Sequence, residues 1–201
     1  MASNSLTEGP RIILEDLPKV PNLAKAHGIV MGLAFVIAMP LGAFLVRTLR
    51  CKYTVWIHAV CQLTAVVLMV TGLATGIRLA KIIDMLHDNS HTILGTAIVA
   101  GLFLQPFLGY IHHRRYLKTK RPTAWGAFHV WYGRALIILG IINGGLGLQL
   151  ASESPAYSQA GMVVYFVLAG IAGVSLISLV VYVMQGRCGG GKAEAESNEG
   201  D

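Results

Sequence analysis

The sequence predicts an all-α fold, a bundle of five transmembrane helices. Of the 201 residues, 54% are hydrophobic and only 13% are charged, a balance typical of membrane proteins rather than of soluble domains. Five apolar segments each reach the roughly 20 residues that a helix needs to cross a bilayer. Short polar connections separate these segments, so consecutive helices are expected to run antiparallel in one bundle.

The five predicted spans divide the chain into three parts. The spans cover residues 26–46, 54–79, 91–111, 125–150 and 159–184. Residues 1–24 form a polar N-terminal segment with three prolines, and they lack the apolar stretch of a signal peptide. Residues 25–186 form the transmembrane domain. Residues 187–201 are polar and rich in glycine, and we expect them to form a disordered cytoplasmic tail.

Basic residues predict the orientation in the bilayer. We call the side that holds the N-terminus side A and the opposite side side B. Side B carries Arg47, Arg50, Lys52, Arg114, Arg115, Lys118, Lys120, Arg121, Arg187 and Lys192, and side A carries Arg11, Lys19, Lys25, Arg78 and Lys81. The positive-inside rule therefore makes side B cytoplasmic, in the plasma membrane or an endomembrane vesicle. Topology accounts for the net charge of +6, so nucleic acid is not an expected partner.

Four histidines stand at matching depths in four consecutive spans. His27 and His91 lie near the side-A entrances of the first and third spans. His58 and His129 lie near the side-B entrances of the second and fourth spans. Ionisable groups at membrane depth are costly and usually functional. Because alternate helices can face each other across a four-helix core, depth predicts two pairs, one near each membrane face.

Two facing imidazoles are suited to haem, whose iron takes axial ligands perpendicular to the ring. The five spans contain no Asp or Glu, so the carboxylates that would complete the shell of a bare metal ion are missing. A ligand that brings its own four equatorial nitrogens is therefore favoured, with one haem for each pair. A histidine-lined transporter of a metal ion or of protons is the alternative.

Small and polar residues accompany the histidines at helical spacing. Gly95 follows His91 by four residues and Gly133 follows His129 by four, so each glycine shares a helix face with its histidine. The missing side chain leaves room for a porphyrin edge or for close helix packing. Gln62 occupies the equivalent position after His58, where its amide can bond a haem substituent.

His87 is the main rival ligand, because it precedes His91 by four residues. The intervening stretch HDNSH offers three N-cap candidates, which place the helix start just before His91 and favour His91 as the ligand. His87 with Asp84 and Asp88 is also a candidate surface metal site, although a solvated loop is the simpler interpretation.

Further basic residues lie within or beside the spans. Arg134 lies about 16 Å along the fourth helix if that helix begins near Thr123, which is close to mid-bilayer. We expect it to face the bundle interior, near a haem propionate, backbone carbonyls or water; outward snorkelling is the alternative. His112 and His113 border the membrane beside Arg114, where interfacial anchoring is the expected role.

On these motifs the chain resembles the cytochrome b561 family, in particular the five-helix form that often follows an extracellular DOMON domain. The resemblance covers residues 27–184 and rests on the order and spacing of HGIVMG, HAVCQ, HTILG and HVWYGR. It implies a four-helix core with two haem b groups, each ligated from alternate helices. The implied ligand pairs are His27 with His91 and His58 with His129.

The resemblance also implies transmembrane electron transfer. Family members pass electrons from a cytoplasmic donor, commonly ascorbate, to an extracytoplasmic acceptor such as monodehydroascorbate, a ferric chelate or a partner domain. The chain is thus expected to act as a ferric or ascorbate-dependent reductase, or as a membrane anchor and electron partner of a DOMON-type domain. The stretch FLVRTLR resembles the donor site of the family, which assigns Arg47 and Arg50 to the donor, with Lys52 just beyond.

Overall fold

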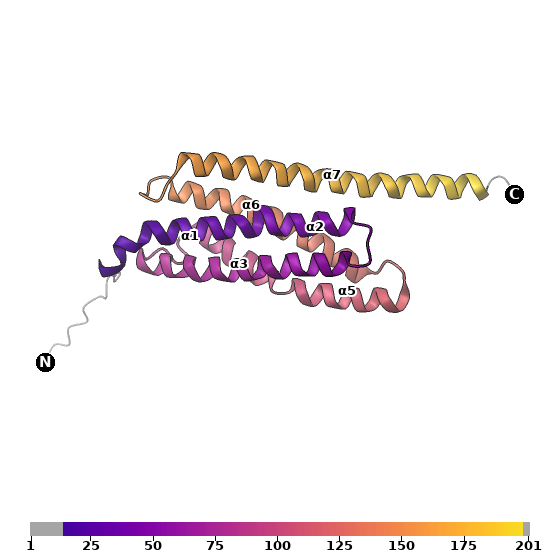
Figure 1. Ribbon diagram of the computed structural model, residues 1–201, viewed down its shortest axis with the longest axis horizontal. Coiled ribbons are helices and arrows are strands. Elements are labelled where there is room, and N and C mark those ends of the chain that lie inside the picture. Colours follow the sequence, from indigo (N-terminus) through magenta and orange to yellow (C-terminus); the bar gives the residue numbers. More distant parts are fainter. Residues whose placement is uncertain (1–13, 199–201) are drawn as a thin grey trace.

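The computed structural model describes residues 14–198 of the chain, and the side chains of residues 16–182. The described chain is helical, with no strand among these residues, and its long helices run alternately up and down beside one another (Figure 1). Five stretches are long and apolar enough to cross a membrane: Asp16–Thr48, Thr54–Ile82, Ser90–Thr119, Ala124–Ala151 and Gln159–Tyr182. The predicted five-helix membrane bundle is confirmed, and the first and third helical stretches extend well beyond the predicted spans.

The first span changes its helical pattern halfway across the membrane. It consists of η1 (Leu14–Lys19), α1 (Val20–Gly32), a π-helical segment η2 (Leu33–Ala38) and α2 (Met39–Thr48). In η2 the amide of Met39 bonds the carbonyl of Ala34, five residues back. Pro40 follows immediately and has no N–H to donate, so the wider turn lets the helix continue past it.

The third span is broken, whereas the second and fourth are continuous. The second is α3 (Thr54–Ile82), and the fourth is α6 (Ala124–Ala151). The third consists of α4 (Ser90–Leu102) and α5 (Gln105–Thr119), separated by residues 103–104. Pro106 lies in the first turn of α5 and cannot donate the backbone hydrogen bond that would join the two helices. The apolar pattern alone predicts one uninterrupted segment here.

Side-chain caps fix where α4 and α6 begin. The Asn89 side chain accepts a hydrogen bond from the amide of Thr92 at 3.0 Å, and Thr123 caps α6 through the amide of Gly126. Asn89 is one of the predicted N-caps, and the predicted start of this helix just before His91 is confirmed. Both caps place a histidine close to the membrane entrance of its helix.

The fifth span packs on the outside of the other four. α7 (Gln159–Asn198) contacts α2, α6 and η2, and it contributes none of the four paired histidines. Figure 1 shows it running past the end of the bundle on the side of its C-terminus. The helix continues through residues 187–198, where composition predicts a disordered tail.

An apolar layer fills the middle of the bundle, halfway between its two ends. The buried cluster consists of Ala34, Phe35, Met39, Ala65, Met69, Ile98, Val99, Leu102, Leu136, Ile137 and Leu176. The Phe35 ring packs directly on Gly140 of α6, where any larger residue would collide with it. This layer separates the two groups of histidines described next.

Candidate functional site

The structure brings the four membrane histidines together as two pairs. The ring centroids of His27 and His91 lie 5.8 Å apart, with the ring planes at 86°. Those of His58 and His129 lie 6.5 Å apart, with the planes at 90°. All four side chains are half-buried. These are the pairs that depth predicts, and their binding of haem stays a prediction.

Backbone carbonyls on neighbouring helices hold three of the four rings. Because a carbonyl oxygen can only accept a hydrogen bond, Nδ1 must be the donor, and in a neutral imidazole the lone pair is then on Nε2. This arrangement is usual for histidines that bind a metal. The bonds run from Nδ1 of His27 to Gly72 at 2.8 Å, of His58 to Gly42 at 2.8 Å and of His91 to Asn143 at 2.9 Å.

The spacing of each pair fits an iron between the rings. An imidazole nitrogen binds a metal at about 2 Å and the ring centre lies about 1 Å behind it, so two rings on one metal stand roughly 6 Å apart. The measured separations of 5.8 and 6.5 Å lie on either side of that value. Among the side chains that the structure describes, no cluster of three or more His, Cys, Asp or Glu could hold a bare ion. The donor set therefore fits haem, which supplies the other four nitrogens itself.

Glycines on the facing helices admit the rings on side A. A methyl group at Gly76 of α3 would lie 2.7 Å from the His27 ring, and one at Gly147 of α6 would lie 2.8 Å from Cε1 of His91. Both distances are shorter than side-chain atoms tolerate. The hydrogen bonds of the two rings therefore depend on the absence of a side chain opposite them.

A single antiparallel register sets α6 against α4 and α5. His91 faces Gly147, and Gly95 faces Asn143, whose amide nitrogen would lie 2.9 Å from an added methyl. The step from His91 to Gly95 along α4 thus matches the step from Gly147 back to Asn143 along α6, as expected for antiparallel helices. Gly95 makes room for an amide side chain of α6, so of the two predicted uses of this glycine the structure shows close helix packing.

The same register continues along α5, where a polar side chain meets a glycine three times in succession. The facing pairs are Gln105 with Gly133 at 2.8 Å, His129 with Gly109 at 3.2 Å and His112 with Gly126 at 2.5 Å, each measured to a methyl added at the glycine. Gly133 therefore also serves close packing, here against Gln105. We call these three pairs the α5–α6 seam.

His112 belongs to this seam and not only to the membrane border. Its ring stacks on that of His129, with centroids 6.3 Å apart and planes at 22°, and its Nδ1 is buried. Anchoring at the interface therefore does not account for its position. No sequence signal distinguishes it from His113, because its place depends on the register between α5 and α6.

His87 lies outside both pairs. It is exposed in the loop before α4 and has a φ of 63°, so it does not share the helix face of His91. Asp84 and Asp88 are exposed in the same loop, and the three side chains do not form a metal cluster. The surface metal site considered from the sequence is not formed.

Two other predicted site residues make contacts within the protein. Gln62 donates from its amide nitrogen to the carbonyl of Met39 at 3.1 Å, which leaves its second N–H and its amide oxygen for a haem substituent. Arg134 is half-buried and stacks on Trp131, with the guanidinium 5.0 Å from the ring centroid. Trp131 is itself 55% exposed at the bundle surface. This contact agrees better with the snorkelling alternative than with a side chain buried in the interior.

The predicted donor-site cations gather at the side-B end of the first hairpin. Arg47 lies in the last turn of α2, and Arg50 and Lys52 lie in the loop that follows; all three are exposed. Lys52 lies over the ring of Tyr53 at 4.9 Å.

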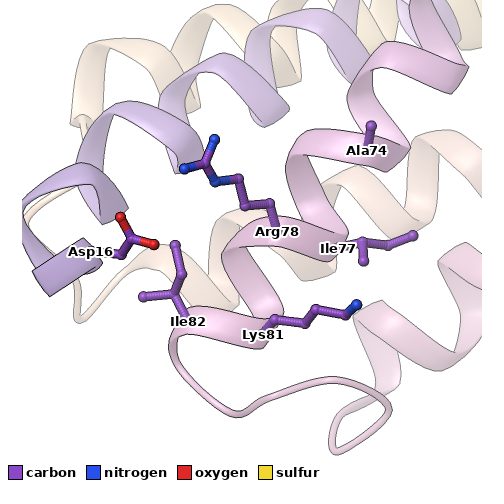
Figure 2. Close-up of a pocket in the computed structure, with 6 residues that line it drawn as sticks. All are labelled: Asp16, Ala74, Ile77, Arg78, Lys81 and Ile82. Carbon is purple, nitrogen blue, oxygen red and sulfur yellow. The ribbon is translucent and has the colours of Figure 1, made fainter. Parts of the chain in front are cut away.

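An open pocket with two cations lies at the opposite end, on side A. It has a volume of about 350 Å³ and is lined by Asp16, Ala74, Ile77, Arg78, Lys81 and Ile82. Figure 2 shows Arg78 and Lys81 extending from α3, with Asp16 on the facing η1 helix. Arg78 is two residues beyond Gly76, which receives the His27 ring. The sequence gives no signal for this pocket beyond its count of basic residues.

Comparison with known proteins agrees with this architecture. The sequence model of eukaryotic cytochrome b561 matches residues 26–153. Two cytochrome b561 and DOMON domain-containing proteins of Arabidopsis thaliana are each 30% identical to the chain, over 73% and 85% of its length. A cytochrome b561 domain-containing protein of the same plant is 27% identical over 84% of the chain.

The matches cover different shares of these relatives. The chain spans 37% and 43% of the two DOMON-containing proteins and 65% of the third relative. No solved structure matches the chain. The family match covers more than half of the chain and includes all four paired histidines, so the chain belongs to the eukaryotic cytochrome b561 family.

Proposed function

We propose that this chain conducts electrons across the membrane through two b-type haems, one near each face, each ligated by two histidines. As a cytochrome b561, the chain is a transmembrane electron-transfer protein that binds b-type haem. The proposal adds the number of haems, their ligands, the direction of flow and the chemistry of donor and acceptor.

The observation that carries the proposal is the arrangement of the four imidazoles. They form two pairs at opposite ends of the bundle, with ring centroids 5.8 and 6.5 Å apart. Three of the rings have Nδ1 committed to a carbonyl, which leaves Nε2 available for iron. When bound, each haem supplies an iron that is reversibly reduced by one electron. Two histidines would hold each haem, and a haem held by two histidines would favour electron transfer over oxygen binding.

The protein's own part is to hold the imidazoles, exclude water and shape the local charge. The apolar layer around Phe35 and Met69 keeps the middle of the bundle dry between the two pairs. In this low-dielectric setting, nearby charges and hydrogen bonds to the ligands set the reduction potentials. No side chain is required as nucleophile. Only electrons cross the membrane, and the proton that ascorbate loses when it gives up one electron is released on the donor side.

Charge at the two ends supports a direction from side B to side A. The N-terminus is placed outside and the C-terminus inside by the positive-inside rule. Arg47, Arg50 and Lys52 at the cytoplasmic end attract an anionic reductant such as ascorbate. At the outer end, Arg78 and Lys81 favour an anionic acceptor such as a ferric chelate or monodehydroascorbate. A DOMON-type domain, such as the two DOMON domain-containing relatives are named for, is the alternative acceptor.

Reconstitution into vesicles tests the proposal. Vesicles loaded with ascorbate and carrying the purified protein should reduce external ferric citrate, and the reduced protein should show b-type α bands from two haems per chain. Empty vesicles, and vesicles without internal ascorbate, are the controls. A colourless protein that carries metal ions or protons would contradict electron conduction and support the transporter alternative.

A further inference from the structure

We propose that ordered water lies in the α5–α6 seam and holds the imidazole of His129 through Gln105 and His112. The proposal rests on the proposed function, in which His129 is an iron ligand. It makes Gln105 and His112 positioning residues of the side-B pair, although neither is assigned to haem by the sequence.

His129 differs from the other three paired histidines in how its ring is held. Nδ1 of His27, His58 and His91 each meets a backbone carbonyl. Nδ1 of His129 is buried and has no partner among the described protein groups. If Nε2 faces iron, Nδ1 carries the proton and is a buried donor that needs an acceptor.

Two further buried atoms in the same seam also have no protein partner. These are Oε1 of Gln105 and Nδ1 of His112. The backbone carbonyl of His129 accepts from Nε2 of Gln105 at 3.3 Å, and the ring of His129 stacks on that of His112. The imidazole of His129 therefore has one unsatisfied atom of its own, Nδ1, and two more on its neighbours in the seam. Buried polar atoms of this kind are normally satisfied by internal water.

The spacing of the seam calls for more than one water molecule. Gln105 and His112 are seven residues apart on one face of α5, which is about 10 Å at 1.5 Å per residue. His129 enters between them, opposite Gly109. The glycines opposite Gln105, His129 and His112 let these side chains approach the facing helix closely, which brings their unsatisfied atoms into one seam. A short file of water fits this arrangement better than a single bridging molecule.

Water also balances the donors and acceptors. One molecule accepts the proton of His129 Nδ1 and donates to Oε1 of Gln105, which can only accept. A second molecule connects the first to Nδ1 of His112. His129 is thus held by water and amide groups, whereas the other side-B ligand, His58, and both side-A ligands are held by backbone carbonyls.

The expected effect on the side-B haem has a definite sign. A hydrogen bond from Nδ1 to an acceptor makes the imidazole a stronger electron donor to iron, which favours the ferric state. Removing the acceptor should therefore raise the midpoint potential of the side-B haem and leave that of the side-A haem unchanged. Gln105→Met and His112→Phe remove the polar atoms while keeping side-chain volume and, for His112, the stacked ring.

Infrared and redox measurements on the haem-loaded protein test the proposal. Reduced-minus-oxidised infrared spectra of the wild type should contain a water O–H band that shifts in H₂¹⁸O. That band should be lost in Gln105→Met and His112→Phe, and the side-B potential should rise in both. Tyr132→Phe is the matched control, because Tyr132 bonds the carbonyl of Gly101 at the α4–α6 contact and lies outside the seam. His112→Asn, which keeps a polar atom near the position of Nδ1, should restore the band.

Three results would overturn the inference: a wild-type spectrum insensitive to H₂¹⁸O, a band that survives in both variants, or a lost band with no change in potential. Failure of the proposed function looks different. If His129→Ala kept two normal haem spectra, His129 would not be a ligand, whatever the infrared spectra showed.

Discussion

The imidazoles of His27 and His91 lie 5.8 Å apart with their planes nearly perpendicular, although the two residues belong to different helices. Each is held from the side by a carbonyl of yet another helix, Gly72 of α3 for His27 and Asn143 of α6 for His91. Four helices therefore cooperate to place two nitrogens. The glycines opposite the rings are part of the same arrangement, which leads to a direct test.

Replacing Gly147 by alanine should damage the side-A haem site. The added methyl would lie 2.8 Å from Cε1 of His91, so the ring must move or the helices must separate. Overpacking of this kind typically costs about 1–3 kcal/mol. We expect a lower haem content, with the loss confined to the side-A component, and a lower melting temperature.

Gly170→Ala in α7 is the matched control for this substitution. No atom lies within 4 Å of a methyl added there, and alanine favours helix over glycine. Its haem content and stability should equal or slightly exceed those of the wild type. The role assigned to Gly147 would be wrong if Gly147→Ala behaved like Gly170→Ala.

Neutralising the side-A pocket should slow reduction of anionic acceptors. Arg78→Gln and Lys81→Gln each remove a cation from the pocket, and the loss of electrostatic attraction should lower kcat/KM for ferric citrate roughly threefold to tenfold at low salt. High salt should shrink the difference, since screening weakens the field in the wild type as well. Haem spectra should be unchanged.

Two controls separate this effect from general damage. A neutral acceptor should be reduced at the wild-type rate by both variants. Lys25→Gln removes an exposed side-A cation that does not line the pocket, and it should have a smaller effect. Equal losses with charged and neutral acceptors would rule out an electrostatic role for the pocket.

Cys51 offers a test of the orientation in the membrane. It is exposed in the loop between α2 and α3, on the side that the positive-inside rule makes cytoplasmic. In a variant whose other two cysteines are replaced by serine, a membrane-impermeant maleimide should label Cys51 only after the cells are permeabilised. Labelling of intact cells would reverse the proposed topology, and with it the proposed direction of electron flow.

The pH dependence of this labelling should reveal the hydrogen bond to Thr54. The Thr54 hydroxyl lies 3.6 Å from Sγ, and this contact, followed by backbone groups, lowers the pKa of the Cys51 thiol. A lowered pKa keeps the reactive thiolate present at lower pH, so the alkylation rate should rise at a lower pH than for an ordinary thiol near about 8.5. In Thr54→Val the alkylation rate of Cys51 should rise only at a higher pH. Identical pH profiles for the two proteins would show that the Thr54 hydroxyl does not lower the pKa of the thiol.

The sequence was sufficient to predict the bundle and the pairing of the histidines, for identifiable physical reasons. Bilayer thickness fixes the length of each span, and alternating direction then fixes which histidines share a depth. His27 and His91 meet because both follow the start of a helix that enters from side A. The N-cap at Asn89 is likewise a local signal, since its side chain bonds an amide only three residues away.

What the sequence could not predict depends on the register between helices. His112 and Gln105 reach the seam because the antiparallel register that sets α6 against α4 continues along α5. Neighbouring His113 has the same chemistry and a different position. The roles of Gly95 and Gly133 were similarly open, because helical spacing places a glycine on a face without saying which side chain of another helix will occupy the gap.

The haem content and redox titration of the four single His→Ala variants test the central claim most directly. Depth and ring geometry predict two classes of variant. His27→Ala and His91→Ala should lose or alter one and the same haem component. His58→Ala and His129→Ala should lose or alter the other, with the first component intact. A variant that keeps both components, or a loss shared by His27→Ala and His58→Ala but not by His91→Ala, would contradict the two-pair arrangement.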